Sequence, residues 1–337
     1  MSPSSSPSPF SSILISPADF HSAKTSSFPR RILPVAAGRA SLLPTFQAQH
    51  IPNSIFFNMD LIADTTSPYP QMLPTAAQFA ASMRALGVRP DDILVVYDTP
   101  EVGMYSAPRV AWTCRFFGHA DVHVMNNFRV YVEEGYPVEM ETGEEGLSLS
   151  ISTSPTAIPV EDGDVDGYYP LGESVTQQQQ QQYDVIAFDE LRDLLLLRSS
   201  NSSSSSSSDK AGGYQIIDAR IPGRFSGSQD EMDPSLRSGH MPRAVNVPLA
   251  QMLDADTKAF LPVEALRGVF ADAGVRAADL PLVILTCNSG VTAAALDLAL
   301  RETGLARETR LRLYDGSWME WTRRAEGALV VKDGEEE

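Results

Sequence analysis

Short apolar, β-branched segments alternate along this chain with stretches whose apolar residues recur at helical spacing. The clearest segment runs over 282–286 and ends at Cys287. A short polar loop with a glycine follows, and then the alanine- and leucine-rich stretch 292–300. That order predicts a buried strand, a tight loop and a helix. The same alternation elsewhere predicts an α/β fold in which helices flank parallel sheets.

The chain also repeats itself at a nearly constant spacing of 189 or 190 residues. The paired landmarks are 50–52 and 240–242, 94–98 and 283–287, and 126–127 and 315–316. Three landmarks in register predict two homologous domains. Asp98 falls where the second copy has Cys287. We therefore expect the first domain to lack the nucleophile and to serve as scaffold and lid.

Low-complexity segments divide the 337 residues. The predicted parts are a disordered N-terminus over 1–12, a non-catalytic domain over 13–138, an acidic and glutamine-rich linker over 139–182, a catalytic domain over 183–330 with a serine-rich insertion at 199–210, and an acidic tail over 331–337. The linker and the insertion lack the apolar groups that would offset ordering entropy, so we expect both to be disordered.

The formal net charge of −17 arises in large part from the linker and the tail. Segment 139–182 holds nine acidic residues and no Lys or Arg, which argues against direct nucleic-acid binding. No stretch approaches the length of a membrane span. No basic residue precedes Lys24, and Lys24, Arg30 and Arg31 give only a weak hint of a transit peptide, so we expect a cytoplasmic protein, with mitochondria as the alternative.

Cys114 and Cys287 are the two cysteines, too few for a disulfide framework, so we expect a reducing compartment. Cys114 lies among apolar residues at helical spacing, which favours packing. Cys287 would meet loop N–H groups and the positive end of a helix, a setting that stabilises a thiolate or a bound anion. The alternative for Cys287 is an inert core residue. Five scattered histidines offer no metal-ligand cluster, so we expect no metal and no cofactor.

A set of short motifs stands in a fixed order along the chain. They are 50–52 (His-Ile-Pro), 67–69 (Ser-Pro-Tyr), 72–74 (Met-Leu-Pro), 106–109 (Ser-Ala-Pro-Arg), 218–220 (Asp-Ala-Arg), 223–225 (Gly-Arg-Phe), 238–240 (Ser-Gly-His), 246–248 (Asn-Val-Pro), 287–292 (Cys-Asn-Ser-Gly-Val-Thr) and 314–318 (Tyr-Asp-Gly-Ser-Trp). With these motifs in this order, the chain resembles the tandem-rhodanese sulfurtransferases, which act on thiosulfate and 3-mercaptopyruvate. The resemblance is strongest to their fungal branch. The resemblance covers roughly 13–138 and 183–330.

The resemblance implies a mechanism and a set of site residues. Cys287 would attack the sulfur of the donor and keep it as a persulfide, which a thiol or cyanide would then remove. The donor's carboxylate would be held by Arg224. Ser289 would hydrogen-bond the leaving carbonyl oxygen or relay a proton. Asp60 matches a carboxylate that the family places across the cleft; its alternative role is a turn or cap. The loop residues that would hold the persulfide are Asn288, Gly290, Val291 and Thr292.

The same resemblance implies a donor preference. Ser289 matches the mercaptopyruvate enzymes, and the lysine with which classical rhodaneses hold thiosulfate is absent. We therefore expect 3-mercaptopyruvate as the better donor and thiosulfate as the poorer one. Three departures from the family concern this choice: Gln71 replaces a histidine of the animal mercaptopyruvate enzymes, Asp233 replaces their second substrate arginine, and Asn288 replaces a glycine. The expected acceptor is a thiol, such as that of thioredoxin or of a sulfur-carrier protein.

Rival functions make different demands on the sequence. A cysteine phosphatase on this fold needs an arginine six positions after the cysteine, where this chain has Ala293. A persulfide relay that feeds tRNA wobble-uridine thiolation would share Cys287 but turn over small molecules slowly. A catalytically dead scaffold is disfavoured because the cysteine is present. For His50 and His240 we expect structural hydrogen bonds. For Trp318 and Trp321 we expect a packing role near the cleft entrance.

Overall fold

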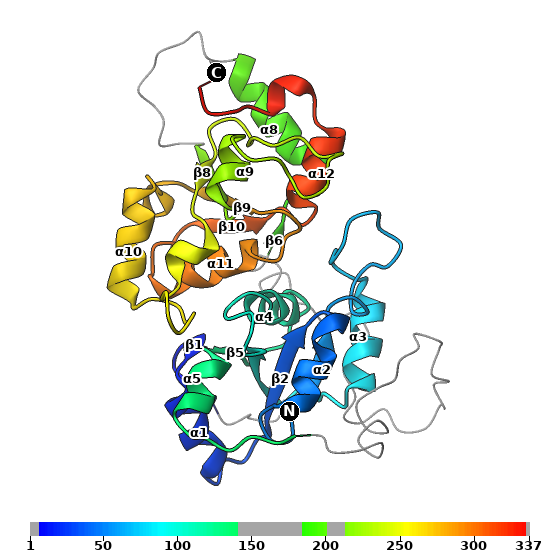
Figure 1. Ribbon diagram of the computed structural model, residues 1–337, viewed down its shortest axis with the longest axis vertical. Helices are drawn as coiled ribbons and strands as arrows, with labels where there is room; N and C mark the ends of the chain where they lie inside the picture. Colours follow the sequence, from blue (N-terminus) through cyan, green and yellow to red (C-terminus); the bar gives the residue numbers. More distant parts are fainter. Residues whose placement is uncertain (1–6, 141–183, 201–212, 335–337) are drawn as a thin grey trace, which may run out of the picture. The chain divides into compact units, whose positions relative to one another are not determined.

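The computed structural model describes residues 7–140, 184–200 and 213–334, with the backbone alone over 198–200. The chain forms two compact units (Figure 1). The first comprises residues 1–180 together with 257–259, and the second comprises 181–256 and 260–337. The predicted linker, the serine-rich insertion and part of the acidic tail lie outside the described residues, so the predicted domain boundaries stay predictions.

The first unit is built on a five-stranded sheet in the order β1-β5-β4-β2-β3, and every neighbouring pair is parallel. Helix α1 begins with a capping box in which Ser16 and Asp19 bond each other's backbone N–H groups. The elements in chain order are β1 (Leu14–Ile15), α1 (Pro17–Thr25), β2 (Ile32–Gly38), η1 (Ala40–Leu42), α2 (Leu43–Ala48), β3 (Ile55–Asn58), α3 (Ala76–Ala85), β4 (Ile93–Asp98), α4 (Ala107–Phe116), β5 (Val122–Met125) and α5 (Phe128–Glu133).

The second unit contains a five-stranded parallel sheet in the order β6-β10-β9-β7-β8. Its elements are β6 (Asp184–Val185), α8 (Phe188–Ser200), β7 (Tyr214–Asp218), α9 (Pro222–Ser226), β8 (Val245–Asn246), η3 (Leu249–Met252), α10 (Val263–Asp272), η4 (Ala277–Asp279), β9 (Leu282–Thr286), α11 (Ala293–Glu302), β10 (Arg310–Leu313), α12 (Ser317–Arg324) and η5 (Gly327–Leu329).

The two sheets have the same topology, because β1 to β5 take the places that β6 to β10 take in the second sheet. The predicted fold of two homologous α/β units is therefore confirmed. Strands β4 and β9 occupy the middle of their sheets. Their runs of apolar residues follow from that position, since a central parallel strand is covered on both faces. Cys287 comes directly after β9, as the pattern predicts, and Asp98 ends β4.

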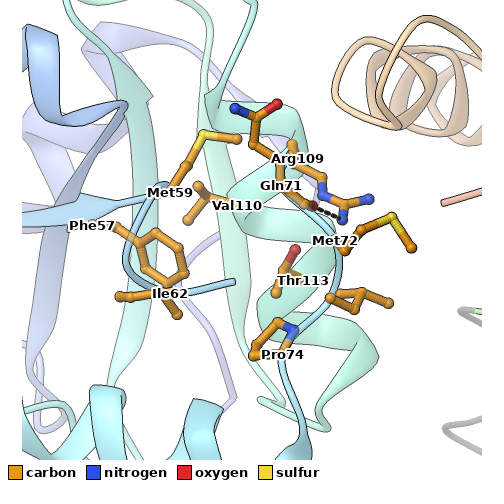
Figure 2. Close-up of a pocket in the computed structure, with 10 residues that line it drawn as sticks. Phe57, Met59, Ile62, Gln71, Met72, Pro74, Arg109, Val110 and Thr113 are labelled. Atoms are coloured by element: carbon orange, nitrogen blue, oxygen red, sulfur yellow. Dashed lines mark hydrogen bonds between the residues drawn. The ribbon is translucent and has the colours of Figure 1, made fainter. Parts of the chain in front are cut away.

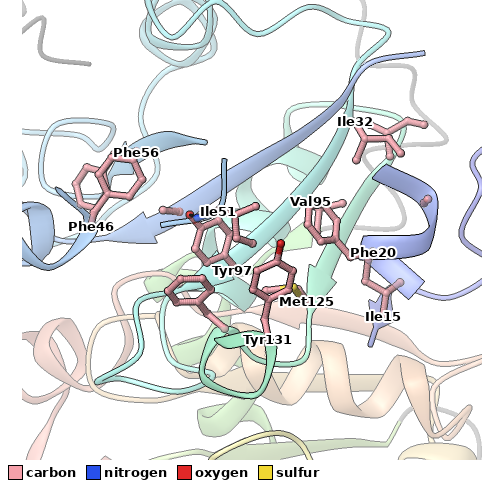
Figure 3. Packing of buried hydrophobic residues seen from close by; sticks show 14 residues of the cluster. Ile15, Phe20, Ile32, Phe46, Ile51, Phe56, Val95, Tyr97, Met125 and Tyr131 are labelled. Carbon is pink, nitrogen blue, oxygen red and sulfur yellow. Dashed lines mark hydrogen bonds between the residues drawn. The ribbon is translucent and has the colours of Figure 1, made fainter. Parts of the chain in front are cut away.

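Buried side chains on one side of the first sheet form a cluster that includes Phe46, Ile51, Tyr97 and Tyr131 (Figure 3). The second unit has a corresponding cluster around Trp318 and Trp321, both fully buried. Each indole N–H donates to a backbone carbonyl, at 2.9 Å in both cases. A buried tryptophan with a satisfied N–H is a packing residue, so the prediction for these two is confirmed.

The two repeated histidines serve the same structural purpose in each unit. Backbone bridges pair His50 with Glu139 and His240 with Val331. Each imidazole lies within hydrogen-bond distance of a backbone carbonyl at Nδ1, that of Phe46 at 2.9 Å for His50 and that of Phe225 at 3.0 Å for His240. Each ring also stacks on the same phenylalanine. Both histidines therefore make structural hydrogen bonds, as predicted.

The structure differs from the sequence prediction at the N-terminus. Residues 7–12, predicted as part of a disordered stretch, contact the first sheet. The Phe10 ring packs edge-on against His123, with 4.8 Å between ring centroids, and Ser8 Oγ lies 2.9 Å from Nε2 of the same histidine. Composition alone does not predict these contacts, because a single phenylalanine ring and a single hydroxyl make them within a serine- and proline-rich stretch.

Candidate active site

The loop after β9 carries the predicted nucleophile. Cys287 is 2 % exposed and leads into residues 288–292, which connect β9 to α11. Gly290 has a φ of 77°, a left-handed conformation that favours glycine and lets the loop turn sharply into the helix. The strand, the tight loop and the helix predicted around Cys287 are all present.

Helix α12 fixes the backbone of this loop. The Cys287 carbonyl accepts the N–H of Trp318 at 3.0 Å, and the Asn288 carbonyl accepts the N–H of Met319 at 3.0 Å. The Cys287 N–H donates to Ser317 Oγ at 3.2 Å, and that hydroxyl in turn donates to the Tyr314 carbonyl at 2.7 Å. These bonds place the cysteine on a rigid support. Ser317 belongs to the 314–318 motif, and only the fold brings it into contact with Cys287.

The start of α11 is suited to a negative charge. The helix has ten residues, and its N-cap residue, Thr292, makes no side-chain cap hydrogen bond. The first N–H groups of a helix lack intrahelical acceptors and carry partial positive charge. A loop that ends at such a helix start can hold an anion on backbone N–H groups. Cys287, Ser289 and Thr292 therefore lie on one short loop that leads into the positive end of a helix dipole.

The first unit uses the corresponding helix start differently. Asp98 is buried, and its carboxylate accepts the N–H of Ser106 at 2.8 Å and that of Ala107 at 2.9 Å. The helix that begins there, α4, is therefore capped by an internal carboxylate in place of an external anion. Asp98 thus stands at the place in the first unit where the second unit has Cys287, and the non-catalytic role of the first unit stays a prediction.

Asp98 should make the stability of the protein depend on pH. Burial raises the pKa of this carboxyl to about 7, above its ordinary value of 3.8. A raised folded-state pKa gives stability that is complete below about pH 4 and is lost as pH rises toward 7. The free energy of unfolding of the wild type, relative to Asp98→Asn, should therefore fall between pH 5 and 7, by up to about 1.4 kcal/mol per pH unit. Urea denaturation of both proteins across this range checks it; a constant difference would contradict it.

Cys114 is fully buried in α4, and burial raises the pKa of its thiol to about 12. A thiol with that pKa is almost entirely protonated at neutral pH and is a poor nucleophile. The predicted packing role of Cys114 agrees with this environment.

Arg224 lies in α9 of the second unit with its side chain 20 % exposed. Its Nε is 3.7 Å from Oε2 of Glu231, which is itself buried. Glu231 also accepts a hydrogen bond from Arg220 at 2.9 Å. Sequence reasoning missed Glu231 entirely. An acidic residue seven positions after a candidate arginine is a weak signal, because the turn that brings the two together is not visible in the sequence.

Asp60 lies in the first unit, where both of its carboxylate oxygens have partners. Oδ1 accepts from Arg39 Nε at 2.9 Å, and Oδ2 accepts from the backbone N–H of Ala40 at 2.9 Å. Asp60 therefore caps the start of η1, which is the alternative role expected for it. The predicted catalytic role of Asp60 stays a prediction.

Two of the departures from the family can be placed. Gln71 has a φ of 57°, and its carbonyl accepts a hydrogen bond from Arg109 at 2.8 Å, beside a small pocket in the first unit (Figure 2). Asp233 pairs with Arg323 at 2.8 Å, and hydrogen bonds from Ser235 hold the pKa of its carboxyl below the ordinary value. The carboxylate at 233 is thus occupied by structural partners.

Across the described ranges, His, Cys, Asp and Glu side chains form no group of three or more that could hold a metal ion. Within the same ranges, no helix has both the length and the apolar character needed to cross a membrane.

Known proteins share this fold and this order of elements. Residues 206–324 match the family described as rhodanese-like domain. The chain is 33% identical to the thiosulfate sulfurtransferase TUM1 of Saccharomyces cerevisiae, over 93% of this chain and 95% of the yeast protein. It is 31% identical to the 3-mercaptopyruvate sulfurtransferase of Mus musculus, over 86% of this chain and 82% of the mouse protein.

Solved structures give the same result. The crystal structure of Tum1 from Saccharomyces cerevisiae matches with a TM-score of 0.75 at 32% identity, and covers 96% of this chain and 98% of the yeast chain. The sulfur transferase subunit of yeast mitochondrial complex I, described as sub-stoichiometric, matches with a TM-score of 0.73 at 28% identity over 95% and 99% of the two chains.

Two parallel sheets of one topology, with a cysteine loop after the central strand of the second, define a tandem rhodanese-like protein. The chain belongs to the thiosulfate and 3-mercaptopyruvate sulfurtransferase family, and it is a sulfurtransferase. The family and the enzyme class predicted from the sequence are thereby confirmed.

Proposed function

We propose that this enzyme moves the sulfane sulfur of 3-mercaptopyruvate to a thiol or cyanide through a persulfide on Cys287. The observation that carries the proposal is the position of Cys287 on a rigid loop between a central strand and the start of α11. The loop N–H groups and the helix start stabilise negative charge on sulfur. Cys114, deep in α4, has no comparable setting.

The first half-reaction makes one bond and breaks one. The Cys287 thiolate attacks the donor sulfur, the sulfur–carbon bond breaks, and pyruvate leaves as its enolate with the bonding electron pair. The enolate then takes a proton and becomes pyruvate. In the second half-reaction an acceptor thiolate attacks the outer sulfur and regenerates the Cys287 thiolate. Because the donor product leaves before the acceptor reacts, the kinetics should be ping-pong.

Arg224 is proposed to bind the donor carboxylate, since a guanidinium pairs with a carboxylate through two parallel hydrogen bonds. The partial exposure of its side chain leaves it accessible to a ligand. Ser289 is proposed to hydrogen-bond the leaving carbonyl oxygen or to relay its proton. Asn288, Gly290, Val291 and Thr292 would contribute loop backbone around the persulfide, and Asp60 is kept as a candidate carboxylate from the first unit.

Steady-state kinetics with two donors and two acceptors test the proposal. Initial rates are measured with 3-mercaptopyruvate and with thiosulfate, each against cyanide and against a reduced dithiol such as thioredoxin. We expect turnover with both donors, a higher kcat/KM for 3-mercaptopyruvate, and a persulfide on Cys287 by mass spectrometry. The absence of turnover with either donor, but with a persulfide present, would favour the alternative of a protein-specific relay that feeds tRNA wobble-uridine thiolation.

Ser289→Lys should move the preference toward thiosulfate. The lysine would add a positive charge on the loop where a dianion must bind, and 3-mercaptopyruvate offers a single negative charge. We expect the ratio of kcat/KM for thiosulfate to that for 3-mercaptopyruvate to rise by about fivefold or more. Ser289→Ala is the matched control, because it removes the hydroxyl without adding charge. An unchanged ratio in Ser289→Lys would show that this position does not set donor choice.

The proposed compartment follows the same comparisons. The yeast complex I subunit is mitochondrial by its description, and an Arabidopsis thaliana relative is described as mitochondrial. These names support the mitochondrial alternative beside the predicted cytoplasmic pool. Fractionation of cells that express the tagged chain would separate the two.

A further inference from the structure

A continuous chain of charged groups runs from the sheet of the second unit to Arg224. It starts at Asp218, the last residue of β7, whose carboxylate accepts hydrogen bonds from Arg220 Nε at 2.9 Å and from its Nη2 at 2.7 Å. Arg220 continues to Glu231, with 2.9 Å between Nη1 and Oε1. Glu231 then approaches Arg224, with 3.7 Å between Oε2 and Nε.

The first three groups of this chain are held rigidly. Arg220 is 4 % exposed, and its guanidinium lies 3.9 Å from the ring centroid of Trp318. It also donates to the Gly239 carbonyl at 2.6 Å. The N–H of Gly239 donates to the Arg224 carbonyl at 2.9 Å, so the same glycine fixes the backbone of the second arginine. A Cβ at Gly239 would lie 2.4 Å from the Val331 carbonyl oxygen, which leaves no room for another residue.

The last link is different. The Nε of Arg224 is buried and has no hydrogen-bond partner among the described residues, although Glu231 Oε2 is at ion-pair distance. The Glu231 side chain is 2 % exposed, and burial raises the pKa of its carboxyl in spite of the two neighbouring guanidinium groups. A carboxylate so deeply buried is costly unless it is paired. Within the described part of the chain, Arg220 alone supplies a hydrogen-bonded partner to Glu231, so the second oxygen of this carboxylate remains available to Arg224.

We propose that Glu231 is a positioning residue for Arg224: its Oε2 engages Nε and directs the outer fork of the guanidinium toward the donor's anionic group. This inference rests on the proposed role of Arg224 in donor binding. A guanidinium can pair with two acids at once, one on its Nε edge and one across its terminal nitrogens. Hydrogen bonds of this kind are often long in the free enzyme and shorten when the ligand binds.

Charge and position predict opposite results for Glu231, which makes the idea testable. A negative charge beside Arg224 weakens its attraction for an anion, so removing that charge alone should tighten donor binding. If position dominates, removal lets the guanidinium rotate and the donor binds more weakly. Glu231→Asp separates the two effects, since it keeps the charge and withdraws the carboxylate by one methylene.

The experiment measures KM and kcat of the full chain for 3-mercaptopyruvate and thiosulfate. We expect both Glu231→Gln and Glu231→Asp to raise KM by about fivefold or more, with kcat changed by less than about twofold. The effect of Glu231→Gln should disappear in an Arg224→Ala background, because no guanidinium is left to direct. Asp297→Asn is the matched control, as it breaks a buried acid–arginine pair of the same unit, with Arg301 at 2.8 Å.

Each other outcome overturns the inference. A lower KM in Glu231→Gln would show that its charge dominates. A lower melting temperature with unchanged KM, as expected for Asp297→Asn, would assign Glu231 to stability alone. Equal effects of Glu231→Gln with and without Arg224 would show that the two residues act independently. Loss of the proposed function itself looks different, because the wild type would then show no turnover or no saturation with either donor.

Discussion

Cys287→Ser should abolish sulfur transfer from both donors, with a fall in kcat of about a thousandfold or more. A hydroxyl cannot form the persulfide, and at neutral pH it is ionised far less than a thiol. The side chain is almost isosteric and 2 % exposed, and the loop is held by backbone bonds to α12, so the fold should survive the change. Initial rates with cyanide as acceptor and intact-protein mass after incubation with the donor measure the two consequences.

Cys114→Ser is the matched control, since it makes the same atomic change at the other cysteine. We expect this variant to retain nearly full kcat. Its melting temperature should be lower, because a polar hydroxyl replaces a thiol at a fully buried position of α4. An equal fall in kcat in Cys287→Ser and Cys114→Ser would show that the loss of activity does not depend on the position of the cysteine in the loop. A donor-derived sulfur on the Cys287→Ser protein would exclude Cys287 as the only carrier.

Much of this fold could be predicted because central parallel strands leave a strong imprint on sequence. The segments that became β4 and β9 are apolar almost throughout, and that pattern survives only where both faces of a strand are covered. The repeat was visible for the same reason. His50 and His240 each stand before the corresponding edge strand, β3 in the first sheet and β8 in the second, and each forms a backbone bridge there, so the same short motif recurs.

The site was predicted less completely, and the reason is physical. A cysteine on a loop between a strand and a helix has a local signature in the sequence, and that signature makes Cys287 the candidate nucleophile. Glu231 has none, because its two arginine partners come from the connection after β7 and from α9, and only the fold brings them to this carboxylate. The capping role of Asp60 was one of two open alternatives, because a carboxylate in a turn has the same sequence context whether it caps a helix or faces a substrate.

Arg224→Ala should raise KM for 3-mercaptopyruvate by at least about tenfold, which corresponds to about 1.4 kcal/mol of lost binding free energy. The guanidinium offers a fork that matches the donor carboxylate, and alanine offers nothing in its place. KM for thiosulfate should rise as well, because that donor is also an anion. Arg224→Lys should fall between the two, since it keeps the charge but loses the fork.

The control for this change is Arg276→Ala, which removes an exposed arginine of the same unit that pairs with Asp279 at 3.8 Å. An exposed pair of this kind contributes little to stability, and its loss should leave KM unchanged. If Arg224→Ala also leaves KM unchanged, Arg224 does not bind the donor, and the effect expected for Glu231 loses its basis. If KM rises in both variants by the same factor, donor binding responds to the loss of any positive charge in the unit, and no single fork is required.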